Sequence, residues 1–213
     1  MPQECSTGGQ DNDDKIMKNP AELYVFEGPD GVGKSTLSKW FVNILATRNQ
    51  HPVVWSSFPG NEKGTVGNLV YRLHHDATDL GVKSIHPRSM QLLHIAAHID
   101  AIESRFSEII NSGTSIVLDR FWWSTWVYGR LNGEKASTLE EMIELEITAW
   151  GQIKPKMIFL VSRKSSKLGN AHARLTRLYA QLARKQTGTI PVSRIQNNGD
   201  IKEAQNQILS SLL

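Results

Sequence analysis

The stretch Gly28-Pro29-Asp30-Gly31-Val32-Gly33-Lys34-Ser35 matches the pattern G-x-x-x-x-G-K-[ST] at every fixed position. Glycines allow a tight turn that brings backbone N–H groups against phosphate oxygens. A lysine in this pattern supplies positive charge to the β- and γ-phosphates of a nucleotide, and the hydroxyl after it ligates Mg²⁺. The stretch therefore predicts a site for ATP and Mg²⁺, formed by Gly28, Asp30, Gly31, Gly33, Lys34, Ser35 and Thr36.

The segments on either side of this loop are those that the pattern requires. Tyr24-Val25-Phe26 reads as a short buried strand that ends just before Gly28. After the loop, apolar residues at Leu37, Trp40, Phe41, Ile44 and Leu45 follow the i, i+3, i+4 spacing of a helix with one buried face. A helix that begins near Gly33 points the positive end of its dipole at a bound anion.

Strand patterns and helix patterns alternate along the rest of the chain. Short apolar runs predict further strands at residues 52–58, 115–118, 157–161 and 189–192. Helical spacing predicts helices at residues 89–111, 142–150, 171–185 and 201–212. This alternation is typical of an α/β fold with a parallel sheet and helices on both of its faces. In such sheets a ligand binds beyond the carboxyl ends of the strands.

The composition predicts one soluble domain. Of the 213 residues 39% are hydrophobic and 21% are charged, and no apolar run approaches the roughly 20 residues of a membrane span. Residues 1–19 are polar and predict a flexible tail before a single domain at residues 20–213. The lone Cys5 cannot form an internal disulfide and the N-terminus lacks a secretory pattern, so we expect a cytoplasmic protein without membrane contact.

A second acidic position follows the predicted strand at residues 115–118. The run Ile116-Val117-Leu118 ends in Asp119, and enzymes with this phosphate loop place such an acid near Mg²⁺ and its water shell. Arg120 comes next and has the forked donor geometry that suits phosphate oxygens. We therefore predict that Ser35 and Asp119 hold the metal ion and that Lys34, Asp119 and Arg120 are catalytic.

These motifs together resemble the thymidylate kinase family from Glu22 to the C-terminus. The stretch from Phe26 to Thr36 is similar to that family's phosphate loop, Phe58-Pro59-Gly60 is similar to its segment after the second strand, and Asp119-Arg120-Phe121 with Ser124 and Tyr128 is similar to its Asp-Arg-Tyr-x-x-Ser-x-x-Ala-Tyr pattern. The resemblance implies a P-loop kinase fold with a five-stranded parallel sheet, and a homodimer. It also implies that Asp30 faces the acceptor sugar and that Arg120 holds the acceptor phosphate.

The chain differs from the family at several acceptor positions. Where the family carries an arginine after Phe-Pro-x, this chain has Gly60-Asn61-Glu62-Lys63, so Lys63 is the candidate for the acceptor phosphate. The family's base-reading Phe and Arg are both histidine here, at His94 and His98. The resemblance thus implies an acceptor site that includes Asp30, Phe58, Pro59, Lys63, His94, His98, Arg120, Ser124 and Tyr128.

The segment that closes over ATP in the family is short in this chain. Residues 163–169 alone separate the fourth predicted strand from the next helix, and Val32 stands where some members place a catalytic arginine. The charge of the transition state then requires another cation. Arg163 is the first candidate, followed by Lys164 and Lys167, and a solvated basic loop is the alternative.

Two groups of residues remain open to several interpretations. His94 and His98 share a helix face, and three interpretations are open: they contact the base, they are structural, or they bind a metal. The third fits least well, because the surrounding sequence does not match a zinc motif. Trp122, Trp123 and Trp126 either pack in the core or provide a wall of the acceptor pocket.

Three functions fit the sequence. The first is a nucleoside monophosphate kinase that uses ATP and Mg²⁺ to phosphorylate dTMP or a related or modified pyrimidine deoxynucleotide. The second is a kinase whose acceptor is a modified nucleotide within DNA, an interpretation that the formal net charge of +3 and the pI of about 9.0 accommodate. The third is a P-loop binding or regulatory protein with weak ATPase activity. Phosphorylation of candidate acceptors distinguishes these hypotheses.

Overall fold

The computed structural model describes residues 20–49, 52–164, 169–186 and 188–213, so the predicted tail at residues 1–19 and Lys167 lie outside the described part. The predicted α/β fold is confirmed. Five parallel strands form one sheet in the order β2-β3-β1-β4-β5. The strands are β1 (Leu23–Glu27), β2 (Val53–Ser57), β3 (Ser115–Asp119), β4 (Pro155–Ser162) and β5 (Val192–Gln196).

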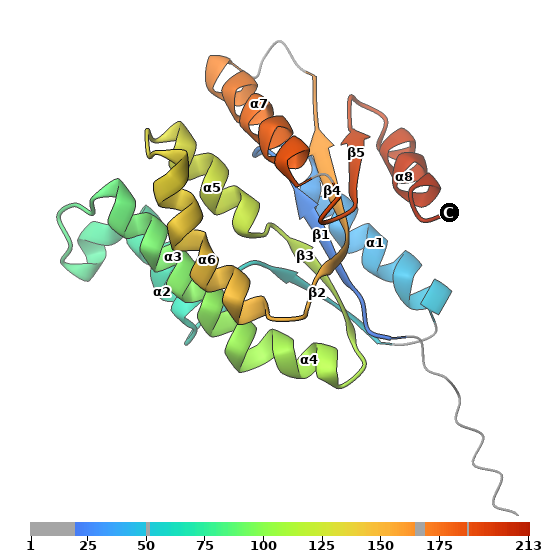
Figure 1. Cartoon of the computed structure of the whole chain (residues 1–213), viewed down its shortest axis with the longest axis horizontal. Coiled ribbons are helices and arrows are strands. Elements are labelled where there is room, and N and C mark those ends of the chain that lie inside the picture. The colour runs from blue at the N-terminus through green and yellow to red at the C-terminus, as the bar shows by residue number, and fades with distance from the viewer. Residues whose placement is uncertain (1–19, 50–51, 165–168, 187) are drawn as a thin grey trace, which may run out of the picture.

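Helices cover both faces of this sheet (Figure 1). One face packs against α1 (Lys34–Asn49) and α8 (Ile201–Ser210), and their shared core includes Phe26, Phe41 and Phe159. The other face packs against α3 (Pro87–Ala101), α5 (Trp122–Leu131), α6 (Ala136–Trp150) and α7 (Asn170–Lys185). This arrangement buries β1 and β3 along their whole length, which explains their continuous apolar sequence.

The register of the central strands sets the position of the site. Phe26 of β1 pairs with Asp119 of β3, so the loop after β1 and the turn after β3 leave the sheet side by side. On the outer side of β3, Ser57 of β2 also pairs with Asp119. The residues that follow these three strands therefore meet at one edge of the sheet.

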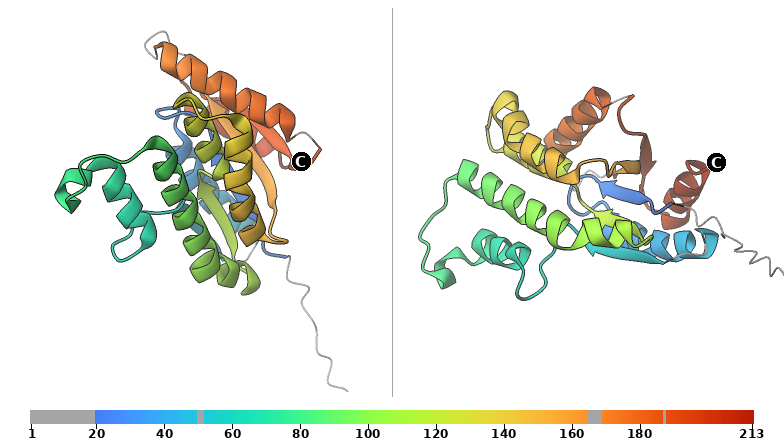
Figure 2. Two further views of the ribbon diagram at one scale, coloured as in Figure 1. Left: turned by 60° about the vertical axis from the view of Figure 1, so that its left-hand side comes forward. Right: turned by 60° about the horizontal axis from the view of Figure 1, so that its bottom comes forward.

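The predicted helix at residues 89–111 has an interruption that sequence spacing did not reveal. It consists of α3, a π-helical segment η2 (Ile102–Phe106) and α4 (Ser107–Asn111) in direct succession. Before it lie α2 (Val66–His75), which Thr65 caps, and the short 3-10 turn η1 (Ala77–Leu80). Figure 2 shows α2 and the start of α3 extending beyond the body of the molecule.

The fifth strand was predicted at the wrong place. It runs over Val192–Gln196 rather than residues 189–192, because an edge strand with Ser193, Arg194 and Gln196 lacks a continuous apolar run. Neither α2 nor α5 was predicted, and the tryptophans of α5 settle one open question. Trp122, Trp123 and Trp126 are 6%, 0% and 1% exposed, so all three pack in the core.

None of the helices in the described part of the chain combines the length and the apolar composition that crossing a membrane requires.

Candidate active site

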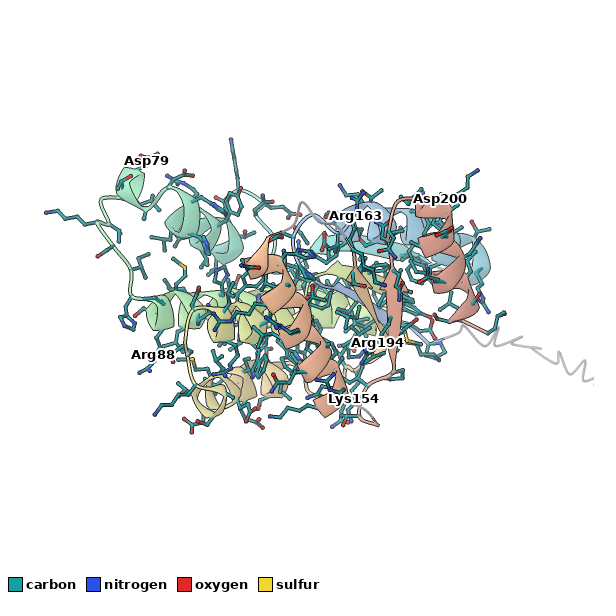
Figure 3. The ribbon with its side chains drawn as sticks, turned by 90° about the horizontal axis from the view of Figure 1, so that it is seen from above. Asp79, Arg88, Lys154, Arg163, Arg194 and Asp200 are labelled. Atoms are coloured by element: carbon teal, nitrogen blue, oxygen red, sulfur yellow. The ribbon has the colours of Figure 1, made fainter. Side chains whose placement is uncertain are left out.

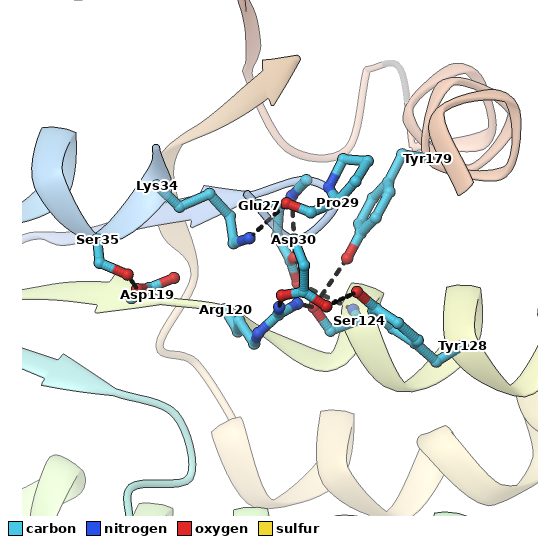
Figure 4. Close-up of polar contacts among 11 residues, drawn as sticks. Glu27, Pro29, Asp30, Lys34, Ser35, Asp119, Arg120, Ser124, Tyr128 and Tyr179 are labelled. Carbon is cyan, nitrogen blue, oxygen red and sulfur yellow. Dashed lines mark hydrogen bonds and ion pairs between the residues drawn. The ribbon is translucent and has the colours of Figure 1, made fainter. Parts of the chain in front are cut away.

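A cavity of about 430 Å³ opens at the carboxyl edge of the sheet. Its lining joins the loop after β1 to the turn after β3 and consists of Asp30, Gly31, Gly33, Lys34, Ser35, Thr36, Asp119 and Arg120. Figure 4 shows these two segments facing one another, with Lys34 and Asp30 above Arg120. The sequence motifs at residues 28–36 and 119–120 thus meet in one place, as the parallel sheet predicts.

Two positions of the loop, Gly28 and Gly33, accept only glycine. Gly28 has a φ of +142°, and a Cβ atom there would lie 2.1 Å from the carbonyl oxygen of Val161 in β4. Gly33 has a φ of +93°, and its Cβ would lie 2.5 Å from the side-chain nitrogen of Asn197. Asn197 is buried and donates from that nitrogen to the carbonyl oxygen of Val32 at 2.8 Å. The loop is therefore held against β4 and the end of β5, and glycine alone fits these contacts.

Lys34 is the first residue of α1 and lies almost wholly inside the loop, with 6% of its surface exposed. Its Nζ donates to the carbonyl oxygen of Pro29 at 2.7 Å. Burial and then the charge of Arg120 lower the pKa of Lys34 to about 8. At neutral pH the ammonium group keeps its charge, although its pKa lies closer to neutral pH than the pKa of an exposed lysine does.

The residues predicted to hold Mg²⁺ are in contact. The Ser35 hydroxyl donates to Oδ2 of Asp119, while Oδ1 of Asp119 is buried and has no hydrogen-bond partner among the described residues. A buried acceptor without a partner suits a water molecule in the shell of a bound cation. No cluster of three or more His, Cys, Asp or Glu residues in the described ranges could hold a metal. Ser35 and Asp119 offer oxygen ligands of the kind that suits Mg²⁺.

Arg120 lies at the centre of a charged cluster on one side of the cavity. Its φ is +80°, which is uncommon for a residue with a side chain, and such strained residues cluster at active sites and ligand clamps. The guanidinium donates from Nη2 to Asp30 and from Nη1 to the hydroxyl of Ser124 at 2.8 Å. The hydroxyl of Tyr128 donates to Oδ2 of Asp30 at 2.5 Å. Four of the predicted acceptor residues thus form one hydrogen-bonded group.

This cluster favours the ionised form of Asp30. Burial opposes ionisation, but Arg120, Tyr128 and Lys34 outweigh it and hold the pKa of Asp30 below its ordinary value. Burial raises the pKa of Tyr128 to about 12, so its hydroxyl keeps its proton at neutral pH. The group therefore offers a carboxylate acceptor, a hydroxyl donor and a permanent cation to a polar ligand.

Sequence reasoning missed a supporting carboxylate. Glu27, the last residue of β1, is fully buried and its Oε1 accepts from the backbone N–H groups of Phe121 at 2.8 Å and Ser124 at 3.0 Å. Its Oε2 accepts from the Ser124 hydroxyl at 2.8 Å, and that hydroxyl also meets the phenol of Tyr179 at 2.9 Å. A charged residue at the end of an otherwise apolar strand was the available signal. Tyr179 lies on α7 and carried no such signal.

The segment after β2 is arranged differently from the expectation. Phe58 is 4% exposed and packs in the core, with its ring stacked on His98 at 4.1 Å between ring centres. Pro59 lines a second cavity of about 210 Å³ outside the phosphate loop, together with Arg105. Lys63 is exposed and, among the described residues, has no hydrogen bond or ion pair with the group around Arg120. Arg105 reaches this segment instead, donating to Glu62 at 3.2 Å and to Ser56 of β2 at 2.9 Å.

The two histidines on α3 have different surroundings. His98 is 4% exposed, and its Nδ1 lies 2.6 Å from Oε2 of the fully buried Glu146 on α6. This geometry favours the structural interpretation of His98. Nε2 of His94 lies 3.2 Å from Nδ1 of His74, and burial, with the neighbouring His98, lowers the pKa of His94 to about 4. His94 is therefore neutral at physiological pH.

Arg163 follows the last residue of β4 and is exposed (Figure 3). The strand that precedes it contacts the phosphate loop, because Gly28 lies against Val161. The described residues include no hydrogen bond or ion pair between Arg163 and the cavity, so its catalytic role stays a prediction. Lys164, the next candidate, donates from its backbone N–H to the side chain of Asn198 at 2.9 Å.

Comparison with known proteins agrees with this architecture. The family model for thymidylate kinase matches residues 26–198. A thymidylate kinase of Desulfotalea psychrophila is 29% identical over 130 residues, which are 61% of this chain and 58% of that protein. One from Roseiflexus castenholzii is 28% identical over 138 residues, 64% of this chain and 57% of that protein. The chain thus spans less than two thirds of the length of these curated relatives.

A solved structure extends the likeness to nearly the whole chain. The crystal structure of thymidylate kinase from Ehrlichia chaffeensis has a TM-score of 0.74 and 18% sequence identity, and covers 92% of this chain and 100% of its own. At that identity the match shows the shared fold. Because the family model covers both the phosphate loop and the turn with Asp119 and Arg120, the chain belongs to the thymidylate kinase family.

Proposed function

We propose that the protein transfers the γ-phosphoryl group of ATP to a deoxynucleoside monophosphate. The observation that carries this proposal is the meeting of two distinct polar groups at one cavity. The loop with Lys34, Ser35 and Asp119 suits a nucleotide triphosphate and Mg²⁺, whereas Arg120, Asp30 and Tyr128 suit a second ligand with a phosphate and hydroxyl groups. Thymidylate kinase relatives support the same reaction class.

The roles of the residues follow from their charges. Lys34 and the loop N–H groups bind the donor phosphates. Arg120 holds the acceptor phosphate, and the carboxylate of Asp30 accepts from a sugar hydroxyl. Ser35 and Asp119 would hold Mg²⁺, which neutralises charge on the donor phosphates when bound. An oxygen of the acceptor phosphate forms the new bond to the γ-phosphorus as the bond to the β-bridging oxygen breaks, and ADP leaves.

This reaction needs no strong general base, because the acceptor oxygen is already ionised. Catalysis then consists of alignment and charge stabilisation, to which Arg120 contributes through its fixed geometry. The exposed Arg163 is the candidate for the additional cation near the transferred group. Its position after β4, the strand that contacts Gly28, supports this assignment.

The acceptor base is proposed to be a pyrimidine, with His94 rather than His98 in the position to contact it. His98 has its Nδ1 directed at Glu146 and its ring face on Phe58, whereas His94 is half-buried and bonded through one nitrogen to His74. A neutral imidazole can stack on a base and form one hydrogen bond to it. We therefore place dTMP and related or modified pyrimidine deoxynucleotides first among the acceptors.

The test is ATP-dependent phosphorylation of dTMP, dUMP, 5-hydroxymethyl-dUMP, dCMP and dGMP, with Lys34→Ala as the inactive control. One pyrimidine monophosphate should dominate, and Lys34→Ala should lose at least about 10²-fold in kcat, as expected for removing a charge-stabilising donor. ADP release that is the same with and without every acceptor would overturn the kinase proposal in favour of an ATPase.

A further inference from the structure

Acidic residues are missing from one long part of the chain. Residues 147–199 contain ten Lys and Arg residues and no Asp or Glu, although the chain has 21 Asp and Glu residues in total. Its described residues include the end of α6, β4, α7 and β5. The small formal net charge of +3 is therefore the sum of a strongly basic part at residues 147–199 and an acidic remainder.

The basic side chains of α7 share one face of the helix. Arg174, Arg177 and Arg184 follow at intervals of three and seven residues, and all three are exposed. The opposite face of α7, with Leu175 and Tyr179 among its residues, is buried in the core. These arginines therefore point away from the sheet into solvent.

Arg194 of β5 lies on the same side of the sheet as α7. It is exposed and pairs in register with Leu160, whose side chain belongs to the same core cluster as the buried face of α7. Residues in register on neighbouring strands point to the same side of a sheet, so Arg194 lies on the α7 side. In the view of Figure 3, Arg194 lies between Arg163 and Lys154.

Few carboxylates neutralise the positive charge of these arginines. Within the described ranges, the ion pairs of the basic segment are Lys156 with Glu22 at 3.2 Å and Lys185 with Glu140 at 2.5 Å. The arginines at 174, 177, 184 and 194 take part in none of the ion pairs found there. A group of guanidinium groups without counter-charges favours an anionic partner.

We propose that the face formed by Arg174, Arg177, Arg184 and Arg194, here called the α7–β5 face, binds the phosphate backbone of a nucleic acid. Guanidinium groups match phosphate oxygens in a forked geometry. The α7 arginines extend over about 15 Å at 1.5 Å per residue, the length of about four phosphates along one strand. A single mononucleotide cannot reach across this distance, whereas a polymer can.

The surroundings of the face favour a nucleic acid over a membrane. The large hydrophobic side chains that are exposed in the described part are Val66, Leu69, Tyr71, Leu92, Leu145, Ile147 and Leu213, and none lies on α7 or β5. A membrane-binding helix would present such side chains for insertion between lipids. Without exposed aromatic rings for stacking, the face should bind backbone phosphates independently of sequence.

The test is the binding of fluorescein-labelled 20-nucleotide DNA, single-stranded and duplex, measured by anisotropy between 50 and 200 mM KCl. ATP and Mg²⁺ at saturating concentration occupy the phosphate loop and exclude binding there. The variant R177Q/R184Q/R194Q should lose at least tenfold in affinity at 50 mM KCl, and its slope of log K against log salt should be smaller by about 2 to 3. The control R72Q/K83Q/K135Q removes the same charge from exposed positions elsewhere and should bind like the wild type.

Three results would overturn the proposal: no salt-dependent DNA binding, an equal loss in the control variant, or tighter binding to phosphatidylserine vesicles than to DNA. If the triple variant does not fold, as judged by circular dichroism, the single variants R177Q and R184Q should each weaken DNA binding. Unchanged DNA binding in both single variants would also overturn the proposal. Phosphorylation of free dTMP is measured in parallel. This activity should be unchanged in these variants, so a failure of the DNA-binding proposal can be distinguished from a failure of the proposed kinase activity.

Discussion

Glu27 at the end of β1 accepts hydrogen bonds from both the backbone N–H and the hydroxyl of Ser124, a residue 97 positions later in the chain. The same Ser124 hydroxyl accepts from the guanidinium of Arg120. Glu27 therefore joins the strand that leads into the phosphate loop to the helix that follows Arg120. Through Ser124 it supports the left-handed conformation of Arg120, whose φ is +80°.

The first prediction concerns this support. Glu27→Gln keeps the size of the side chain but replaces an acceptor oxygen with an NH₂ group that opposes N–H donors. We expect kcat to fall by about 10²-fold, the size expected when a catalytic group moves by roughly 1 Å, with a smaller change in the KM for ATP. Steady-state kinetics with thermal unfolding as a control of folding would measure this. A purely structural Glu27 would lower the melting temperature and leave kcat per folded molecule unchanged.

The second prediction uses the pKa of Lys34, which burial and Arg120 lower to about 8. If the protonated lysine binds phosphate as proposed, the affinity for ATP should decrease as pH rises through 8, approaching about tenfold for each further pH unit in the limit of one coupled proton. Lys34→Arg keeps its charge across this range and should show a flat profile between pH 7 and 9.5. Calorimetric titration with a non-hydrolysable ATP analogue tests this. Parallel profiles for the two proteins would mean that Lys34 is not the titrating group.

The sequence predicted the parts of this site that are local in the chain. Residues 28–36 and 119–120 stand in consecutive positions after buried strands, so their meeting at one cavity could be predicted from the pattern. The contacts of Glu27, Asn197 and Tyr179 depend instead on how distant segments pack, and no spacing rule encodes them. β5 was misplaced for a related reason, because its exposed edge position removes the apolar pattern on which strand prediction relies.

The third prediction concerns Mg²⁺. Asp119→Asn should raise the Mg²⁺ concentration needed for half-maximal ATP turnover by about 10- to 100-fold, because the neutral amide has one acceptor oxygen and no negative charge to attract the metal ion and its water shell. Ser35→Ala should act in the same direction through the loss of a hydroxyl ligand. Turnover measured against free Mg²⁺ at constant ATP provides the test. Equal Mg²⁺ requirements in wild type and Asp119→Asn would remove Asp119 from the metal site.

The fourth prediction concerns the buried pair of His98 and Glu146, which lie 2.6 Å apart. If their role is structural, His98→Phe should keep the ring stacked on Phe58 but leave the carboxylate of Glu146 buried without a partner, at a cost of about 3 kcal/mol in the free energy of unfolding. Replacing both members, as in His98→Phe with Glu146→Leu, removes the unpartnered carboxyl group. The double variant should therefore be more stable than His98→Phe alone, because a buried polar pair is often replaceable by apolar side chains. Urea unfolding with equal m-values measures this coupling. The acceptor preference of the double variant should match that of the wild type, and a changed preference would instead identify His98 as a base contact.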